Sequence, residues 1–190
     1  IAFVRPRTHD LYYWIANPAD SYIQIMDSDG SNLNGVPNLV VDGDSTDQIG
    51  QPSLSPDGTK LAFTSKADGY WHIYTIGVDG TNLTNVTGDW YPWCCHEYPE
   101  WSPDGNQIVF QGDGWDSPGG DGYQGIWRIN ADGTGGSIVV SGGHATMPNW
   151  SPNGDKIAFS MQIDGGGSVE SYHIHTISPD GTNLALLTRG

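Results

Sequence analysis

Short apolar runs alternate with turn signals along the whole chain. Ser-Pro-Asp-Gly at 55–58 recurs at 102–105, and as Ser-Pro-Asn-Gly at 151–154. An apolar run begins three residues after each of these turns, as in Leu61-Ala62-Phe63. No stretch carries a convincing apolar period of 3.6 residues, so the pattern predicts short strands throughout.

A second repeated signal, Asp-Gly, falls between these turns. Its four glycines are Gly30, Gly80, Gly133 and Gly181. An Ile stands seven residues before each of them, and an Ile or Met stands four residues before it. Asp-Gly between strand-like runs predicts a hairpin with a type I′ turn, which needs positive φ. Each repeat of about 50 residues therefore predicts four antiparallel strands, the blade of a β-propeller.

The predicted fold is all-β, a β-propeller of four-stranded antiparallel blades with about four blades visible. We expect one domain over 1–190, with blades at approximately 1–47, 48–96, 97–143 and 144–190. The first blade lacks its inner strand, because its repeat begins at the second strand. Three alternatives follow: an excerpt of a larger propeller, a chain completed by other copies of itself through open blade edges, or four blades that close alone.

The turn residues resemble a known family. Pro-x-Trp-Ser-Pro-Asp-Gly at 99–105 and Asp-Gly-Thr-Asn-Leu at 79–83 resemble the WD-like repeat of TolB-like propellers. Leu54 departs from the pattern where Trp would stand, and 134–136 departs from Thr-Asn-Leu. The resemblance implies a periplasmic or secreted protein that serves as a scaffold, as a partner-binding platform, or as a non-catalytic domain beside a peptidase or polysaccharide lyase.

Composition and charge narrow the classes of partner. The chain has 7 Lys and Arg against 22 Asp and Glu, a net charge of −15. Such an acidic chain is a poor ligand for nucleic acid or for anionic lipid. No apolar run approaches the ~18–20 residues of a membrane span, so we expect no membrane insertion. The 8 Trp, 9 Tyr and 4 Phe can supply a core.

Long, dissimilar loops are expected on one face of the blades, and the short Asp-Gly turns on the other. Variable loops on a rigid scaffold usually carry function. The predicted ligand-binding residues on the loop face are Trp90, Trp93, His96, Glu97, Trp115, Tyr123 and His144. His96, Glu97 and His144 are expected to ring the mouth of the channel. The expected ligand is neutral or cationic, with a glycan preferred and a protein partner as the close rival.

Two groups of residues suggest metal binding. Asp42, Asp44 and Asp47 have the spacing of carboxylates in a calcium loop, although the Glu of an EF-hand is missing. An ordinary turn is the alternative. His96 and His144 with Glu97 form a second candidate, suggested by the resemblance to lyases with this type of propeller. Calcium is the one cofactor that the sequence suggests.

Cys94 and Cys95 are adjacent. The alternatives are a vicinal disulfide, two free thiols, or a bond to another chain. A vicinal bridge closes a strained ring and requires an oxidising compartment and a rigid loop.

No catalytic constellation stands out. The chain has no Gly-x-Ser-x-Gly elbow and no His-Glu-x-x-His motif. Together with the resemblance to TolB-like propellers, the sequence predicts a non-catalytic extracytoplasmic module that binds a glycan or a protein through its loop-rich face. One alternative is a structural unit completed by strand exchange between chains. Another is the propeller domain of a polysaccharide lyase or hydrolase.

Overall fold

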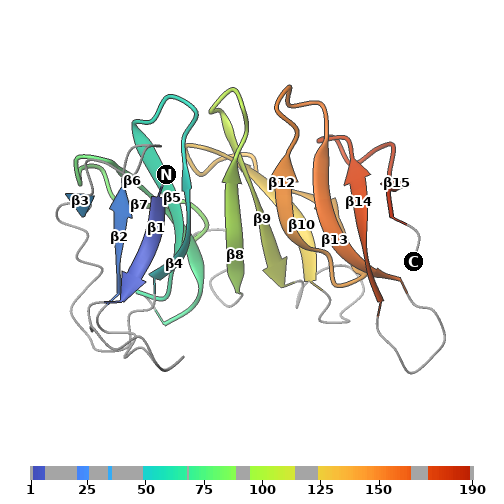
Figure 1. Ribbon diagram of the computed structural model, residues 1–190, viewed down its shortest axis with the longest axis horizontal. Helices are drawn as coiled ribbons and strands as arrows, with labels where there is room; N and C mark the ends of the chain where they lie inside the picture. The colour runs from blue at the N-terminus through green and yellow to red at the C-terminus, as the bar shows by residue number, and fades with distance from the viewer. Residues whose placement is uncertain are drawn as a thin grey trace.

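The computed structural model describes residues 2–6, 21–25, 34–35, 49–67, 69–88, 95–113, 124–163 and 171–188. All the regular elements in these ranges are strands, and they form four separate antiparallel sheets (Figure 1). In this described part of the chain there is no helix long and apolar enough to cross a membrane.

Strands that follow one another in the chain are neighbours in each sheet. The first sheet contains β1 (Ala2–Pro6), β2 (Ser21–Ile25) and β3 (Asn34–Gly35). The second contains β4 (Ile49–Leu54), β5 (Lys60–Ser65), β6 (His72–Gly77) and β7 (Thr84–Asn85). The third contains β8 (His96–Trp101), β9 (Gln107–Asp113), β10 (Gln124–Asn130) and β11 (Ser137–Val140). The fourth contains β12 (Thr146–Trp150), β13 (Ile157–Ile163), β14 (Ser171–Ile177) and β15 (Ala185–Leu186).

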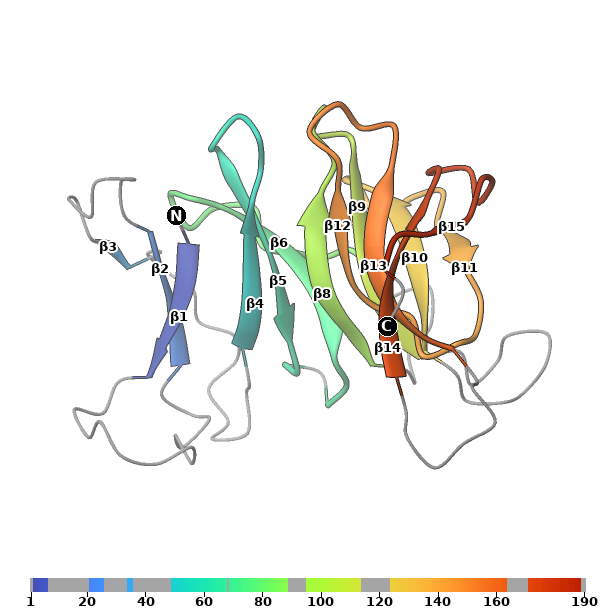
Figure 2. The same cartoon turned by 45° about the vertical axis from the view of Figure 1, so that its right-hand side comes forward.

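The prediction of four-stranded antiparallel blades is confirmed for the second, third and fourth sheets, and the first has three described strands. The four sheets stand in a row, with the first and the fourth at opposite ends (Figures 1 and 2). β4 contacts β1 on one side and β8 on the other, and β8 in turn contacts β12. These first strands of successive sheets therefore line one surface, which we call the axial surface.

The core lies between neighbouring sheets. The apolar runs that follow the Ser-Pro-Asp/Asn-Gly turns supply its largest fully buried side chains, among them Phe63, Phe110 and Phe159. Because side chains alternate between the two faces of a strand, each sheet covers the sheet before it with one set of residues and meets the next sheet with the other. Three clusters result, one at each junction between neighbouring sheets.

The turns differ from the predicted type I′. Positive φ occurs at the glycines, for example 71° at Gly58 and 82° at Gly80, but not at the two residues before each of them. The Gly58 N–H donates to the carbonyl of Ser55 at 2.9 Å, which makes the glycine the last residue of a four-residue turn. The type I′ prediction is therefore wrong, since that turn needs positive φ at both central residues. The hairpins and their positions are as predicted.

Candidate binding surface

We call the end of the sheets that carries the glycine turns the turn side, and the opposite end the loop side. The loop-side half of the axial surface contains an irregularity that recurs in three sheets. The pairing with the next strand shifts by one residue within β4, β8 and β12. The residues at these bulges are Gln51, Tyr98 and Met147, with φ of 51°, 54° and 54°, and each precedes a proline. A non-glycine residue with positive φ costs of order 1–3 kcal/mol. Its occurrence at the same position in three sheets therefore indicates a specific feature of the fold and not a local accident.

Hydrogen bonds between sheets hold the bulges in place. The side-chain oxygen of Gln51 accepts from Thr64 Oγ1 at 2.8 Å and from the backbone N–H of Tyr98 at 2.7 Å. The first bond lies within the second sheet, and the other joins it to the third. The Thr146 hydroxyl donates in the same manner to the side-chain oxygen of Gln111, joining the fourth sheet to the third. The bulged strands are therefore fixed relative to one another before any ligand arrives.

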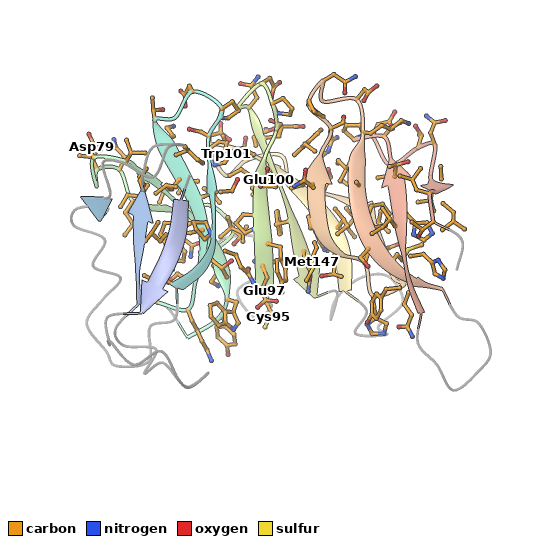
Figure 3. All side chains as sticks on the ribbon, in the orientation of Figure 1. Asp79, Cys95, Glu97, Glu100, Trp101 and Met147 are labelled. Carbon is orange, nitrogen blue, oxygen red and sulfur yellow. The ribbon has the colours of Figure 1, made fainter. Side chains whose placement is uncertain are left out.

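Two carboxylates lie along β8 at different heights. Figure 3 shows Glu97 near the loop side and Glu100 nearer the turn side. Ser53 Oγ donates to Glu100 Oε2 at 2.9 Å, and burial raises the pKa of Glu100 although this bond opposes the shift. Glu97 is half-buried on β8, and Met147, on the contacting strand β12, is 57% exposed. The loop-side half of the axial surface thus offers a carboxylate and an exposed thioether on two contacting strands.

His96 does not lie at the channel mouth, where the sequence predicts it. Its side chain is 3% exposed, and its ring centroid lies 5.2 Å from that of Phe110 and 5.5 Å from that of His72. Burial, with a smaller contribution from His72, lowers the pKa of His96 to about 3. Its Nδ1 has no hydrogen-bond partner among the described residues. The imidazole is neutral near pH 7 and belongs to the junction between the second and third sheets.

The residue opposite His96 explains this burial. His96 pairs with Gly112 across the sheet, and a Cβ on Gly112 would lie 3.2 Å from His96 Cδ2 and 2.9 Å from Trp127 Cδ1. The glycine therefore leaves the space that the two rings occupy. A glycine within a strand is the sequence signal that could have indicated a close approach there.

The other predicted residues have different outcomes. Glu97 and His144 are both half-buried. No three His, Cys, Asp or Glu side chains gather around one possible metal position in the described ranges, so His96, His144 and Glu97 are not brought together as a metal site. Cys95 is half-buried directly before β8. The remaining predicted residues, Trp90, Trp93, Trp115, Tyr123, Asp42, Asp44, Asp47 and Cys94, lie outside the described residues, so calcium binding and the vicinal disulfide stay predictions.

A groove on the turn side was missed by the sequence reasoning. It has a volume of about 650 Å³ and lies between the second and third sheets, with Lys60, Asp79 and Asp132 among its lining residues. Its aspartates already serve the turns, since Asp79 accepts from the N–H and the hydroxyl of Thr81 at 3.0 and 2.7 Å. These bonds lower the pKa of Asp79. The aspartates that line the groove are therefore accounted for by hydrogen bonds within their own turns.

Comparisons with known proteins agree with this architecture. The sequence model of the TolB beta propeller domain matches residues 39–190. An uncharacterised protein of Agrobacterium fabrum is 34% identical over 119 residues, which are 57% of this chain and 38% of that protein. A putative TolB from Agrobacterium tumefaciens superposes with a TM-score of 0.67 at 23% identity, over 87% of this chain and 56% of that one.

Enzymes also share the fold. An oligogalacturonate lyase from Vibrio parahaemolyticus superposes with a TM-score of 0.61 at 14% identity, over 88% of this chain and 42% of that one. At such identity the likeness extends to the fold alone. The chain spans less than two thirds of the length of each of these relatives.

Proposed function

Since the chain belongs to the TolB β-propeller domain family, we propose that it is a non-catalytic module that binds a segment of a protein partner. The proposed site is the loop-side half of the axial surface, defined by Gln51, Glu97, Tyr98 and Met147. The observation that carries the proposal is the bulge repeated in β4, β8 and β12, which holds a strained residue at the same place in three adjacent sheets. Strain of this kind clusters at ligand-binding sites.

The chemistry of the site favours a neutral or basic peptide with an apolar side chain. Met147 offers a large, polarisable and adaptable contact, as methionines do at protein-binding surfaces. Glu97 adds a carboxylate on the contacting strand β8, and the net charge of −15 attracts cationic segments over a longer range. Uronates and other polyanions are disfavoured by the same field.

A glycan is the second candidate, because Trp90, Trp93, Trp115 and Tyr123 stand in the sequence of the long loops. Rings of this kind stack on sugars as readily as they anchor proteins. Met147 and Glu97 favour the protein partner, since a thioether offers no flat ring for a sugar. Following the resemblance of its repeats, we place the chain outside the cytoplasm, in the periplasm or secreted.

The absence of catalysis is part of the proposal. The buried ionisable groups near the axial surface are explained by packing: His72 and His96 contact one another between sheets, and Glu100 is held by Ser53. An assay of the purified chain against peptide and polyuronate substrates tests this point. Turnover that survives further purification would contradict it.

Peptide selection tests the binding site. A displayed library of random peptides is selected against the folded chain, and we expect basic sequences with one large apolar residue. Met147→Asp and Glu97→Lys should each weaken binding about tenfold or more, which corresponds to ~1.4 kcal/mol. Asp155→Lys, an exposed change on the turn side, is the matched control and should have little effect. Peptides that bind Met147→Asp as well as the native chain would reject the site, and binding of neutral oligosaccharides alone would favour the glycan.

A further inference from the structure

One repeat position has side chains of different length at the three junctions between sheets, which we number in chain order. It stands five residues before the Asp-Gly glycine and is occupied by Ile25, Thr75 and Arg128 in the first, second and third sheets. Ile25 packs against the apolar cluster of the first junction. The turn-side groove of about 650 Å³ lies at the second junction, where the short side chain of Thr75 lines it. Both sheets of this junction have a neighbour on each side.

Arg128 shows what the same position does at the third junction. Its Nε donates to Ser137 Oγ at 2.9 Å. Hydrogen bonds from Thr182 lower the pKa of Asp180 in the fourth sheet, and the charge of Arg128 lowers it further. Because the effect of one charge on another falls with distance, the guanidinium lies near the turn that carries Asp180. An arginine of the third sheet thus faces an aspartate of the fourth.

The second sheet has the hydroxyl partner of this arginine without the arginine. Thr75 pairs with Thr84 across β6 and β7, as Arg128 pairs with Ser137 across β10 and β11. Thr84 also lines the groove, and its hydroxyl donates to the carbonyl of Asn82 at 3.2 Å. Since a hydroxyl oxygen can accept while it donates, Thr84 offers the acceptor that Ser137 offers to Arg128.

The acidic partner is present at the second junction as well. Asp132 stands in the third sheet where Asp180 stands in the fourth, and it lines the groove. Its Oδ1 accepts from the N–H and the hydroxyl of Thr134 at 2.9 and 2.7 Å, while its Oδ2 has no hydrogen-bond partner in the part of the chain that the structure describes. Asp180 makes the same two bonds with Thr182 at 3.0 and 2.7 Å and still faces Arg128. The turn bonds therefore leave such an aspartate able to pair with a cation.

We propose that the turn-side groove binds an arginine side chain of a protein partner, with its guanidinium facing Asp132. The partner then supplies at the second junction what Arg128 supplies at the third. A guanidinium suits this place because it carries several N–H donors, and both the Asp132 carboxylate and the Thr84 hydroxyl can accept. The net charge of −15 favours a basic segment. The groove lies at the opposite end of the sheets from the loop-side site, so this inference does not depend on the proposed function.

Lys60 also lines the groove and repels an incoming cation. It does not take the place of the arginine, because hydrogen bonds from Thr134 lower the pKa of Asp132 and no cation among the described residues contributes to that shift. Gln107 stands at the equivalent place in the third sheet, two residues after the glycine of the turn. Lys60→Gln therefore makes the second junction resemble the third and should strengthen arginine binding.

Titration of the 190-residue chain with the tripeptide acetyl-Gly-Arg-Gly-amide tests the proposal. Binding is followed by NMR through the backbone N–H signals of the residues that line the groove. The same tripeptide with citrulline in place of arginine is the neutral probe of matched shape. We expect the citrulline peptide to bind about threefold more weakly, as for the loss of an exposed charge pair. Citrulline binding as tight as arginine binding, or no change of the groove signals, would overturn the proposal.

Two matched variants locate the guanidinium. Asp132→Asn keeps an acceptor for the turn and should weaken binding of the arginine peptide about threefold. Asp180→Asn makes the same change in a turn that already faces an arginine of the chain, and it should leave the affinity unchanged. Equal effects of the two variants would mean that the net charge attracts the peptide without a site, and would overturn the proposal.

Thr75→Arg supplies the missing arginine from the chain itself. Its guanidinium should occupy the groove, abolish binding of the tripeptide and lower the pKa of Asp132 further, which an NMR titration of the carboxyl carbon measures. Near-ultraviolet circular dichroism shows whether this variant is folded, and Asp132→Asn decides the question if it is not. Unchanged binding by a folded Thr75→Arg chain would overturn the proposal.

Methylguanidinium separates an arginine of a protein from a free small cation. It has the charge of the arginine peptide without the peptide backbone. Tighter binding of the tripeptide supports a protein partner, since the walls of the groove then contact the backbone as well. Methylguanidinium binding as tightly as the tripeptide would overturn the assignment to a protein.

Discussion

Hydrogen bonds on the turn side of the sheets join residues that are close in the chain. Those between sheets on the loop side join residues that are far apart in the chain. On the turn side, the aspartates of the described Asp-Gly turns accept from a residue two places further on, as Asp57 does from Thr59 and Asp132 from Thr134. On the loop side, the hydrogen bonds between sheets that fix the bulges join residues 35 to 47 places apart, such as Gln51 with Tyr98. The turn side therefore repeats almost unchanged, whereas each loop-side residue depends on the sheet beside it.

The largest effect on the free energy of unfolding should appear on acidification, through His96 on the loop side. Because the pKa of His96 is about 3 in the folded chain and ~6.5 in the unfolded chain, the unfolded state binds more protons between these values. The free energy of unfolding should then fall by up to ~1.4 kcal/mol for each pH unit below about 6.5. His96→Phe removes this dependence, as denaturant titrations at pH 6.5 and 4.5 would reveal. Equal slopes for the native chain and the variant would contradict the burial of a neutral His96.

The next largest loss of stability is expected when the space opposite His96 is filled. Gly112→Ala places a methyl group 2.9 Å from Trp127 Cδ1, and crowding of this kind costs about 1–3 kcal/mol. The matched control is Gly50→Ala on β4, where nothing lies within 4 Å of the added carbon. Chemical denaturation of both variants measures the difference. Similar stabilities would mean that the third sheet adapts freely at this point.

Loss of a bond between sheets should have a smaller effect. Gln51→Ala removes the acceptor of both Thr64 Oγ1 and the Tyr98 N–H, and an unsatisfied donor costs about 1–3 kcal/mol. We expect the lower part of that range, because Gln51 is only half-buried and water can replace part of the loss. Gln51→Glu keeps an acceptor oxygen and should lose less. If the two variants melt at the same temperature, these bonds do not stabilise the junction.

A change on the turn side should have the smallest effect. Asp57→Ala removes the acceptor of Ser55 Oγ and of the Thr59 N–H, and both groups can turn to water. These bonds lower the pKa of Asp57 in the folded chain below its ordinary value in the unfolded chain. The stabilising effect of Asp57 is therefore complete at a pH above the ordinary pKa, and it is lost as the pH falls through the lowered pKa. The melting temperature at pH 7 should fall less than for Gln51→Ala. A larger fall would reverse the order of the two sides.

The strands, their hairpins and the propeller architecture could all be predicted from the sequence. These features rest on short-range causes: the alternation of apolar residues, the turn residues, and the repetition of both about every 50 residues. Even the turn aspartates could be identified, because their hydrogen-bond partners lie two residues away. The turn type was mistaken because Asp-Gly serves two kinds of hairpin, and only the backbone angles of the residues before the glycine distinguish them.

Differences between equivalent residues of the repeats arise only in the tertiary structure. Ile73 and Ile126 are fully buried because a neighbouring sheet covers them, and their own strands do not record that cover. His96 follows a loop in the sequence, where a side chain that binds a ligand at the surface would be expected. It is buried instead, because Gly112 leaves room for its ring. The bulges at Gln51, Tyr98 and Met147 were not predicted from the sequence either, and the bond between Gln51 and Tyr98 joins one repeat to the next. Contacts between sheets join residues a whole repeat apart, and no local pattern records them.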